Sequence, residues 1–84
     1  MPYIENERRT RLDRIPLEVL VPETEGELNY CLTVLLLNWI GESANYAAYN
    51  AAMGALECAK FELYRRLISR YEDAKILQNG DVYA

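Results

Sequence analysis

The sequence contains no histidine, and this absence excludes several kinds of active site. Without it there is no Ser-His or Cys-His nucleophile pair, and the commonest general base and zinc ligand are missing. The two cysteines, Cys31 and Cys58, stand alone and do not form the paired spacing of a zinc site. The four glycines are scattered, so neither usual phosphate-binding glycine loop is present. We therefore expect no enzyme activity, no metal and no cofactor.

Long apolar runs and an excess of basic residues are also missing. The longest apolar run, Leu32 to Leu37, is interrupted by Thr33 and is far too short to cross a bilayer. The net charge is −4, whereas a protein that binds duplex nucleic acid normally carries a basic face. The sequence also lacks a basic segment followed by an apolar one, the pattern that would suggest secretion. We expect a cytosolic protein with buried, reduced cysteines, and neither a membrane nor duplex nucleic acid as partner.

Apolar residues make up 51% of only 84 residues. A domain of this size buries a small share of its surface, so its own core stabilises it only marginally. Some of the apolar surface should therefore lie against another copy of the chain or against a partner.

The hydrophobic spacing and the helix start and stop signals predict an all-α single domain. Thr24 and Glu27 form a capping-box pattern, Gly41 suits a helix end, and Ser43 or Asn45 can cap the next helix. The predicted segments are an N-terminal arm and short helix (1–22), a helix (24–41), a long helix (43–77), and a turn and tail (78–84). The fold is thus a short helix plus an antiparallel helical hairpin with one long helix.

The long helix carries two apolar stripes and an alanine-rich first half that contains Gly54. A helix that is apolar on two sides usually contacts two neighbours, and small side chains let helix axes approach closely. The shorter helix cannot cover all of the longer one. We therefore expect the chain to assemble as a homo-oligomer.

Tyrosine and arginine side chains are the best candidates for ligand binding. Tyrosine offers a stacking face with a hydroxyl, and arginine offers a fork that matches phosphate. Tyr64, Arg65, Arg66 and Arg70 lie within two turns of the long helix, close to Tyr71. Two interpretations stay open: an anion or nucleotide pocket, or core tyrosines beside surface arginines paired with Glu62 and Glu72.

The tail and one helical amide complete the candidate site. Asn79 and Gly80 favour a tight turn with positive φ, which would return Val82 and Tyr83 to a helix or to a neighbouring chain. Either Asp81 would then reach Arg65, Arg66 or Arg70, or the Asn79 amide and the backbone N–H groups would face an anion. Asn29 is a polar residue on an apolar helix, where it either sets helix register or lines a pocket. The candidate ligand-binding residues are Tyr64, Arg65, Arg66, Arg70, Asn79, Asp81, Tyr83 and Asn29.

Several segments resemble a family of short helical proteins of unknown function encoded by phages, prophages and some microbes. The segments are Met1-Pro2-Tyr3-Ile4, Thr24-x-Gly26-Glu27-Leu28-Asn29-Tyr30, Gly54-x-Leu56-Glu57-Cys58-x-Lys60-x-Glu62-x-Tyr64-Arg65-Arg66, and Tyr71-Glu72-Asp73-x-Lys75-Ile76 with Asn79-Gly80-Asp81-Val82-Tyr83. The resemblance implies a phage-related origin and a compact helical fold, but no activity.

Small helical phage proteins include inhibitors of host defence, some of which sequester nucleotide immune signals, and this comparison is an analogy of size and architecture. Our first hypothesis is accordingly a homo-oligomeric protein that sequesters a small anionic ligand, with a nucleotide-derived immune signal as the candidate. The alternatives are a protein-binding inhibitor of a host defence factor and a magnesium-dependent, all-α nucleotide pyrophosphatase. The last would need carboxylates on one helix face, but Glu57 and Glu62 diverge by about 140°.

Overall fold

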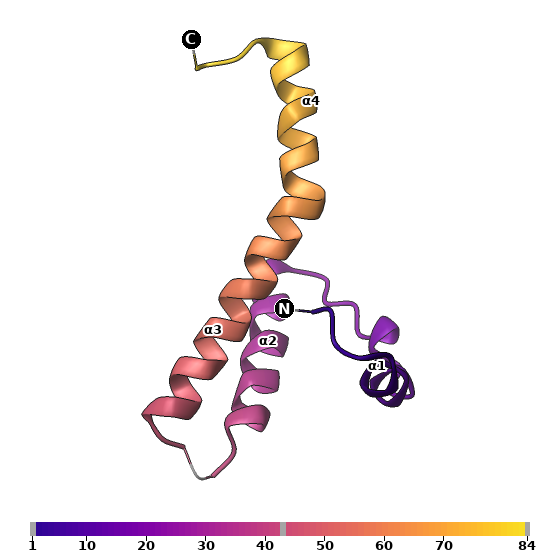
Figure 1. Ribbon diagram of the computed structural model, residues 1–84, viewed down its shortest axis with the longest axis vertical. Coiled ribbons are helices and arrows are strands. Elements are labelled where there is room, and N and C mark those ends of the chain that lie inside the picture. Colours follow the sequence, from indigo (N-terminus) through magenta and orange to yellow (C-terminus); the bar gives the residue numbers. More distant parts are fainter. Residues whose placement is uncertain (1, 43, 84) are drawn as a thin grey trace. The chain divides into compact units, whose positions relative to one another are not determined.

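The computed structural model describes residues 2–42 and 44–83, and within these ranges it contains helices and no strand (Figure 1). The contacts of the chain fall into two units, residues 2–53 and residues 54–84. The all-α prediction is confirmed.

The first unit begins with α1 (Asn6–Asp13) and the short 3-10 helix η1 (Leu17–Val19), followed by α2 (Glu25–Ile40). The start of α2 is the predicted capping box. The Thr24 hydroxyl accepts a hydrogen bond from the Glu27 backbone N–H at 3.1 Å, and the Glu27 carboxylate accepts one from the Glu23 backbone N–H at 3.3 Å. These bonds pair N–H groups that the first turn of a helix leaves without partners.

A short loop joins α2 to α3 (Tyr46–Leu63), and the two helices run in opposite directions (Figure 1). Gly41 ends α2 with a φ of 70°, in the left-handed region that glycine adopts without strain. The Asn45 side-chain oxygen accepts a hydrogen bond from the Ala48 backbone N–H at 2.9 Å and so caps α3. Ser43, the other predicted cap, lies outside the described residues.

Helical structure then continues through the π-helical segment η2 (Tyr64–Ile68) into α4 (Ser69–Asn79). The predicted long helix, 43–77, is therefore observed between Tyr46 and Asn79. Gly54 lies inside α3, and a Cβ atom added there would meet nothing within 4 Å. The close approach that we expected at this glycine is not made within the chain.

Little of the described chain is buried. Ala52 on α3, with 5% of its surface exposed, is the one buried residue of the described ranges, and Leu36 and Ile40 on α2 are half-buried. The expectation of buried cysteines was wrong, since Cys31 is half-buried and Cys58 exposed. Side chains this exposed need another surface if they are to form a core.

Charged residues are almost absent from the hairpin that α2 and the first turns of α3 form. Between Glu27 and Glu57 the only charged residue is Glu42, in the loop, although 26% of the whole chain is charged. We call residues 28–53 the low-charge hairpin. Most of its large apolar side chains are nevertheless exposed.

Candidate functional site

The tyrosine and arginine cluster predicted from the sequence lies on the π-helical segment. In η2 the Ser69 backbone N–H donates to the Tyr64 carbonyl five residues earlier, instead of the usual four. The Ser69 hydroxyl donates a hydrogen bond to the Arg65 carbonyl at 3.2 Å. A side chain therefore satisfies a backbone carbonyl within the π-helical segment. Single π turns inside α-helices are rare and occur frequently at functional sites.

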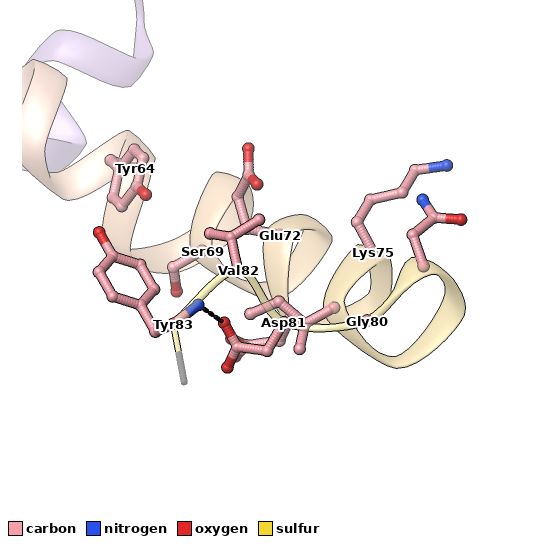
Figure 2. A pocket seen from close by; sticks show the side chains of 11 residues that line it. Tyr64, Ser69, Glu72, Lys75, Gly80, Asp81, Val82 and Tyr83 are labelled. Carbon is pink, nitrogen blue, oxygen red and sulfur yellow. Dashed lines mark hydrogen bonds between the residues drawn. The ribbon is translucent and has the colours of Figure 1, made fainter.

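The tail after α4 is ordered by two hydrogen bonds. Gly80 has a φ of 89°, and its N–H donates to the Ile76 carbonyl at 2.9 Å, which ends the helix. The Asp81 carboxylate accepts a hydrogen bond from the Tyr83 N–H at 2.9 Å, the local turn that aspartate typically forms (Figure 2). The chain thus turns at Gly80, the residue with positive φ, directly after Asn79 as the last helical residue. The expectation that Val82 and Tyr83 return to a helix was wrong, since they are 93% and 86% exposed.

The tail and α4 enclose an open pocket of about 420 Å³. Its lining residues are Tyr64, Ser69, Glu72, Asp73, Lys75, Ile76, Asn79, Gly80, Asp81, Val82 and Tyr83. In Figure 2 the rings of Tyr64 and Tyr83 lie at one end of this pocket and Lys75 at the other. The pocket is built entirely from residues of the second unit.

The pocket lining is acidic. Glu72, Asp73 and Asp81 contribute three carboxylates, whereas Lys75 contributes the single cation of the lining. The Lys75 ammonium donates a hydrogen bond to the Gln78 side-chain oxygen at 3.3 Å and lies 5.5 Å from the centre of the Tyr71 ring. Both contacts stabilise its positive charge outside the pocket's carboxylates. A bare anion would therefore be repelled here, whereas hydroxyl, amine or guanidinium donors suit the carboxylates.

Four of the predicted ligand-binding residues meet in this pocket, namely Tyr64, Asn79, Asp81 and Tyr83. Arg65, Arg66 and Arg70 do not line it. Arg65 instead pairs with the Glu62 carboxylate, three residues earlier on the helix. The Asp81 carboxylate bonds the Tyr83 N–H, and no contact with an arginine is recorded within the described residues.

Asn29 belongs to the first unit, on α2. The Thr33 hydroxyl donates to the Asn29 backbone carbonyl at 2.8 Å and lies 3.2 Å from its side-chain oxygen. These bonds lie along one helix, so they favour a local structural role. Nothing in the pocket of the second unit involves Asn29.

Sequence reasoning missed several lining residues. Ser69, Glu72, Asp73 and Ile76 recur at three- and four-residue spacing and so share one side of α4. That spacing was visible in the sequence, and a tail that turns back at Gly80 selects this face. The tyrosines that we had left as core or pocket, Tyr64 and Tyr71, are both exposed.

Among residues 2–42 and 44–83, no group of three or more cysteine, aspartate or glutamate side chains is placed to hold a metal ion. Over the same ranges, none of the helices combines the length and the apolar character needed to cross a membrane.

Comparison with known proteins identifies the family. Residues 1–82 match the family described as Domain of unknown function (DUF6899). The chain belongs to this family. The match includes the π-helical segment and nearly all of the pocket lining, so both features lie within the DUF6899 domain. No curated protein and no solved structure matches the chain.

Proposed function

We propose that this DUF6899 protein is a non-enzymatic, homo-oligomeric binding protein that sequesters a small anionic ligand, with a nucleotide-derived signal as the candidate. The observation that carries the proposal is the position of the π-helical segment. The rare turn coincides with Tyr64, Arg65 and Arg66, the cluster that residue chemistry alone selects for phosphate and base recognition.

Arg66 and Arg70 are the groups available for phosphate. They are four residues apart and lie on roughly the same side of the helix. Within the described residues neither makes a recorded hydrogen bond or ion pair, whereas Arg65 is held by Glu62. Two unengaged guanidinium groups on one side form a site for a phosphate or a pyrophosphate.

The acidic pocket suits the remainder of a nucleotide. Ribose hydroxyls and the exocyclic amines of bases donate hydrogen bonds, which the carboxylates of Glu72, Asp73 and Asp81 can accept. Tyr64 and Tyr83 provide aromatic faces for a base. The proposal therefore assigns the phosphates to Arg66 and Arg70, and the nucleoside to the pocket.

The proposal includes a setting, which rests on the resemblance of the sequence to phage-encoded proteins. We propose that a phage encodes the protein and that it removes a nucleotide immune signal from the host cytosol. The free thiols of Cys31 and Cys58 agree with a reducing compartment.

A thermal-shift screen with nucleotides and cyclic dinucleotides, with and without magnesium, tests the proposal. A ligand at 100 times its Kd should add about 2.7 kcal/mol to the free energy of unfolding. The double variant Arg66→Gln, Arg70→Gln should lose this stabilisation. The matched variant Arg11→Gln, Arg14→Gln should keep it. The proposal fails if no nucleotide raises the melting temperature, or if both variants respond alike.

A second candidate, a protein-binding inhibitor of a host defence factor, is favoured by the acidic pocket. Glu72, Asp73 and Asp81 beside two tyrosines could accept an arginine or lysine side chain of a basic partner. Native mass spectrometry of protein purified from infected cells separates the two candidates, because one should co-purify with a nucleotide and the other with a protein. The magnesium-dependent pyrophosphatase stays a prediction from sequence, without support from any observed contact.

A further inference from the structure

The apolar residues of α2 surround the helix on nearly every side. Leu28, Leu32, Leu35 and Trp39 follow one another at steps of four, three and four residues, the spacing of a coiled-coil seam, and all four are exposed. Leu37 is exposed on a different side of the same helix. A helix that is apolar all round is normally buried in the interior of a larger structure.

A groove beside this seam extends the apolar surface within the same unit. It encloses about 280 Å³ and is lined by Leu20, Tyr30, Cys31, Val34, Leu35 and Asn38. No charged residue belongs to this lining. Leu35 lies in both the seam and the groove, so the two form one continuous surface.

The low-charge hairpin is large enough for a stable interface between chains. It comprises 26 residues, 28–53, of which Glu42 is the single charged one. A standard interface takes about 800 Å² and roughly 20–30 residues from each partner. The hairpin can therefore supply one side of such an interface by itself.

We propose that the low-charge hairpin is the self-association surface of this protein, with the α2 seam of one chain packed against the α2 seam of a second copy. This inference specifies the assembly part of the proposed function and does not depend on the ligand. In a two-fold arrangement the same residues meet from both chains, so Leu28, Leu32, Leu35 and Trp39 would form both halves of the contact.

The composition of the surface favours a second copy over a transient partner. Interfaces between proteins that also exist apart are about as polar as the rest of the surface, whereas permanent homodimer interfaces are more apolar. The helix has no charged residue from Leu28 to Ile40, and such an apolar surface promotes aggregation for as long as it stays uncovered. A second copy is present wherever the chain is made. Because the charges of the net −4 lie almost wholly outside the hairpin, they oppose its self-contact only weakly.

The single tryptophan allows the surface to be tested in the unmodified protein. Trp39 lies in the seam and is 62% exposed in the single chain. In a concentrated solution we expect a mass above 9.7 kDa by light scattering, together with blue-shifted Trp39 emission and weak acrylamide quenching. Dilution below the dissociation constant should shift the emission to longer wavelength and lower the mass in parallel.

A matched pair of variants locates the contact. Leu35→Glu places a charge in the seam, whereas Leu77→Glu makes the same change at a residue on α4 that is 89% exposed. The first should lower the mass to that of a monomer, or raise the dissociation constant at least tenfold, and the second should leave both unchanged. If Leu35→Glu unfolds, the Trp39 measurements on the unmodified protein still decide the matter.

Three results would overturn the inference. An oligomer in which acrylamide quenches Trp39 freely would assemble through another surface. A monomer with shielded Trp39 would cover its own hairpin. A monomer whose Trp39 emission shifts only on addition of phosphatidylcholine vesicles would bind a lipid surface. Each differs from failure of the anion-binding proposal, which is measured by the nucleotide screen and not by mass or tryptophan emission.

Discussion

The low-charge hairpin and the segment from residue 54 onward are both helical, but the first has an apolar surface and the second a charged one. The hairpin has a single charged residue, Glu42, and exposes leucine, tyrosine and tryptophan. The later segment carries ion pairs, a π-helical turn and an acidic pocket. Burial of apolar area is the main favourable term in association, whereas exposed charges keep a surface hydrated. Under the two proposals above, the first region serves self-association and the second serves ligand recognition.

A charge placed in each region should give the largest difference in the free energy of unfolding. Ala52→Glu introduces a carboxylate at the one buried position of the described chain, and we expect the free energy of unfolding to fall by about 3 kcal/mol. Ala59→Glu makes the same change at an exposed position of α3 and should cost less than about 0.5 kcal/mol. Urea unfolding followed by circular dichroism measures both, and equal losses would contradict the contrast.

The two regions also differ in how their helices begin. Asn45→Ala removes the side chain that caps α3 and should destabilise the protein by about 1 kcal/mol. α4 begins inside continuous helical structure and has no side-chain cap, so Ser69→Ala should have less than half that effect, or about 0.5 kcal/mol at most. Thermal unfolding monitored at 222 nm compares the two variants. A larger loss for Ser69→Ala would mean that its bond to the Arg65 carbonyl holds the π turn.

Gly54 marks the border between the two units and should respond in the opposite direction. Because an added Cβ meets nothing within 4 Å, Gly54→Ala should raise the free energy of unfolding by about 0.5–1 kcal/mol through better helix propensity. The melting temperature measures this change. A destabilised variant would show that a second chain packs closely on this glycine in the assembly.

Surface ion pairs of the later segment should have the smallest effects. Glu57→Gln removes a pair with Lys60 at 3.2 Å in which both side chains are at least half exposed, and we expect a change below about 0.5 kcal/mol. Glu62→Gln removes the pair with Arg65 and should cost about 0.5 kcal/mol, because the Glu62 side chain is only 19% exposed but that of Arg65 is 62% exposed. Unfolding at low and high salt distinguishes them, since the more exposed pair is screened more strongly.

Local signals in the sequence predicted the helices well. The Thr24 and Glu27 box, Gly41 and Asn45 each act within one turn, so their effect can be read from neighbouring residues. The π turn could not be read, because Tyr64-Arg65-Arg66-Leu67-Ile68 is equally compatible with an α-helix. Glu72 and Asp73 were missed as pocket residues, because that role depends on where the chain goes after Gly80.

The burial of side chains was the least predictable property. Apolar residues recur at helical spacing along α2, a pattern typical of a buried side, yet the seam from Leu28 to Trp39 is exposed in the single chain. The pattern records which side chains avoid water and not which molecule covers them. Cys58 and Tyr71 were assessed in the same way, and both proved exposed.

The π turn at Tyr64–Ile68 acts as one additional residue held within a continuous helix. Deleting one residue there would restore regular α-helical hydrogen bonding without breaking the helix. The turns before and after it would keep nearly the same relative facing, because the bond from Ser69 to Tyr64 closes one turn with five residues where an α-helix uses four. Tyr64 and the pocket-lining side of α4 would therefore stay in register. Deleting one residue within α4 itself would instead turn the residues that follow by about 100° and separate Tyr64 from part of the lining. The π turn thus accommodates an extra residue without changing which sides of the helix meet at the pocket.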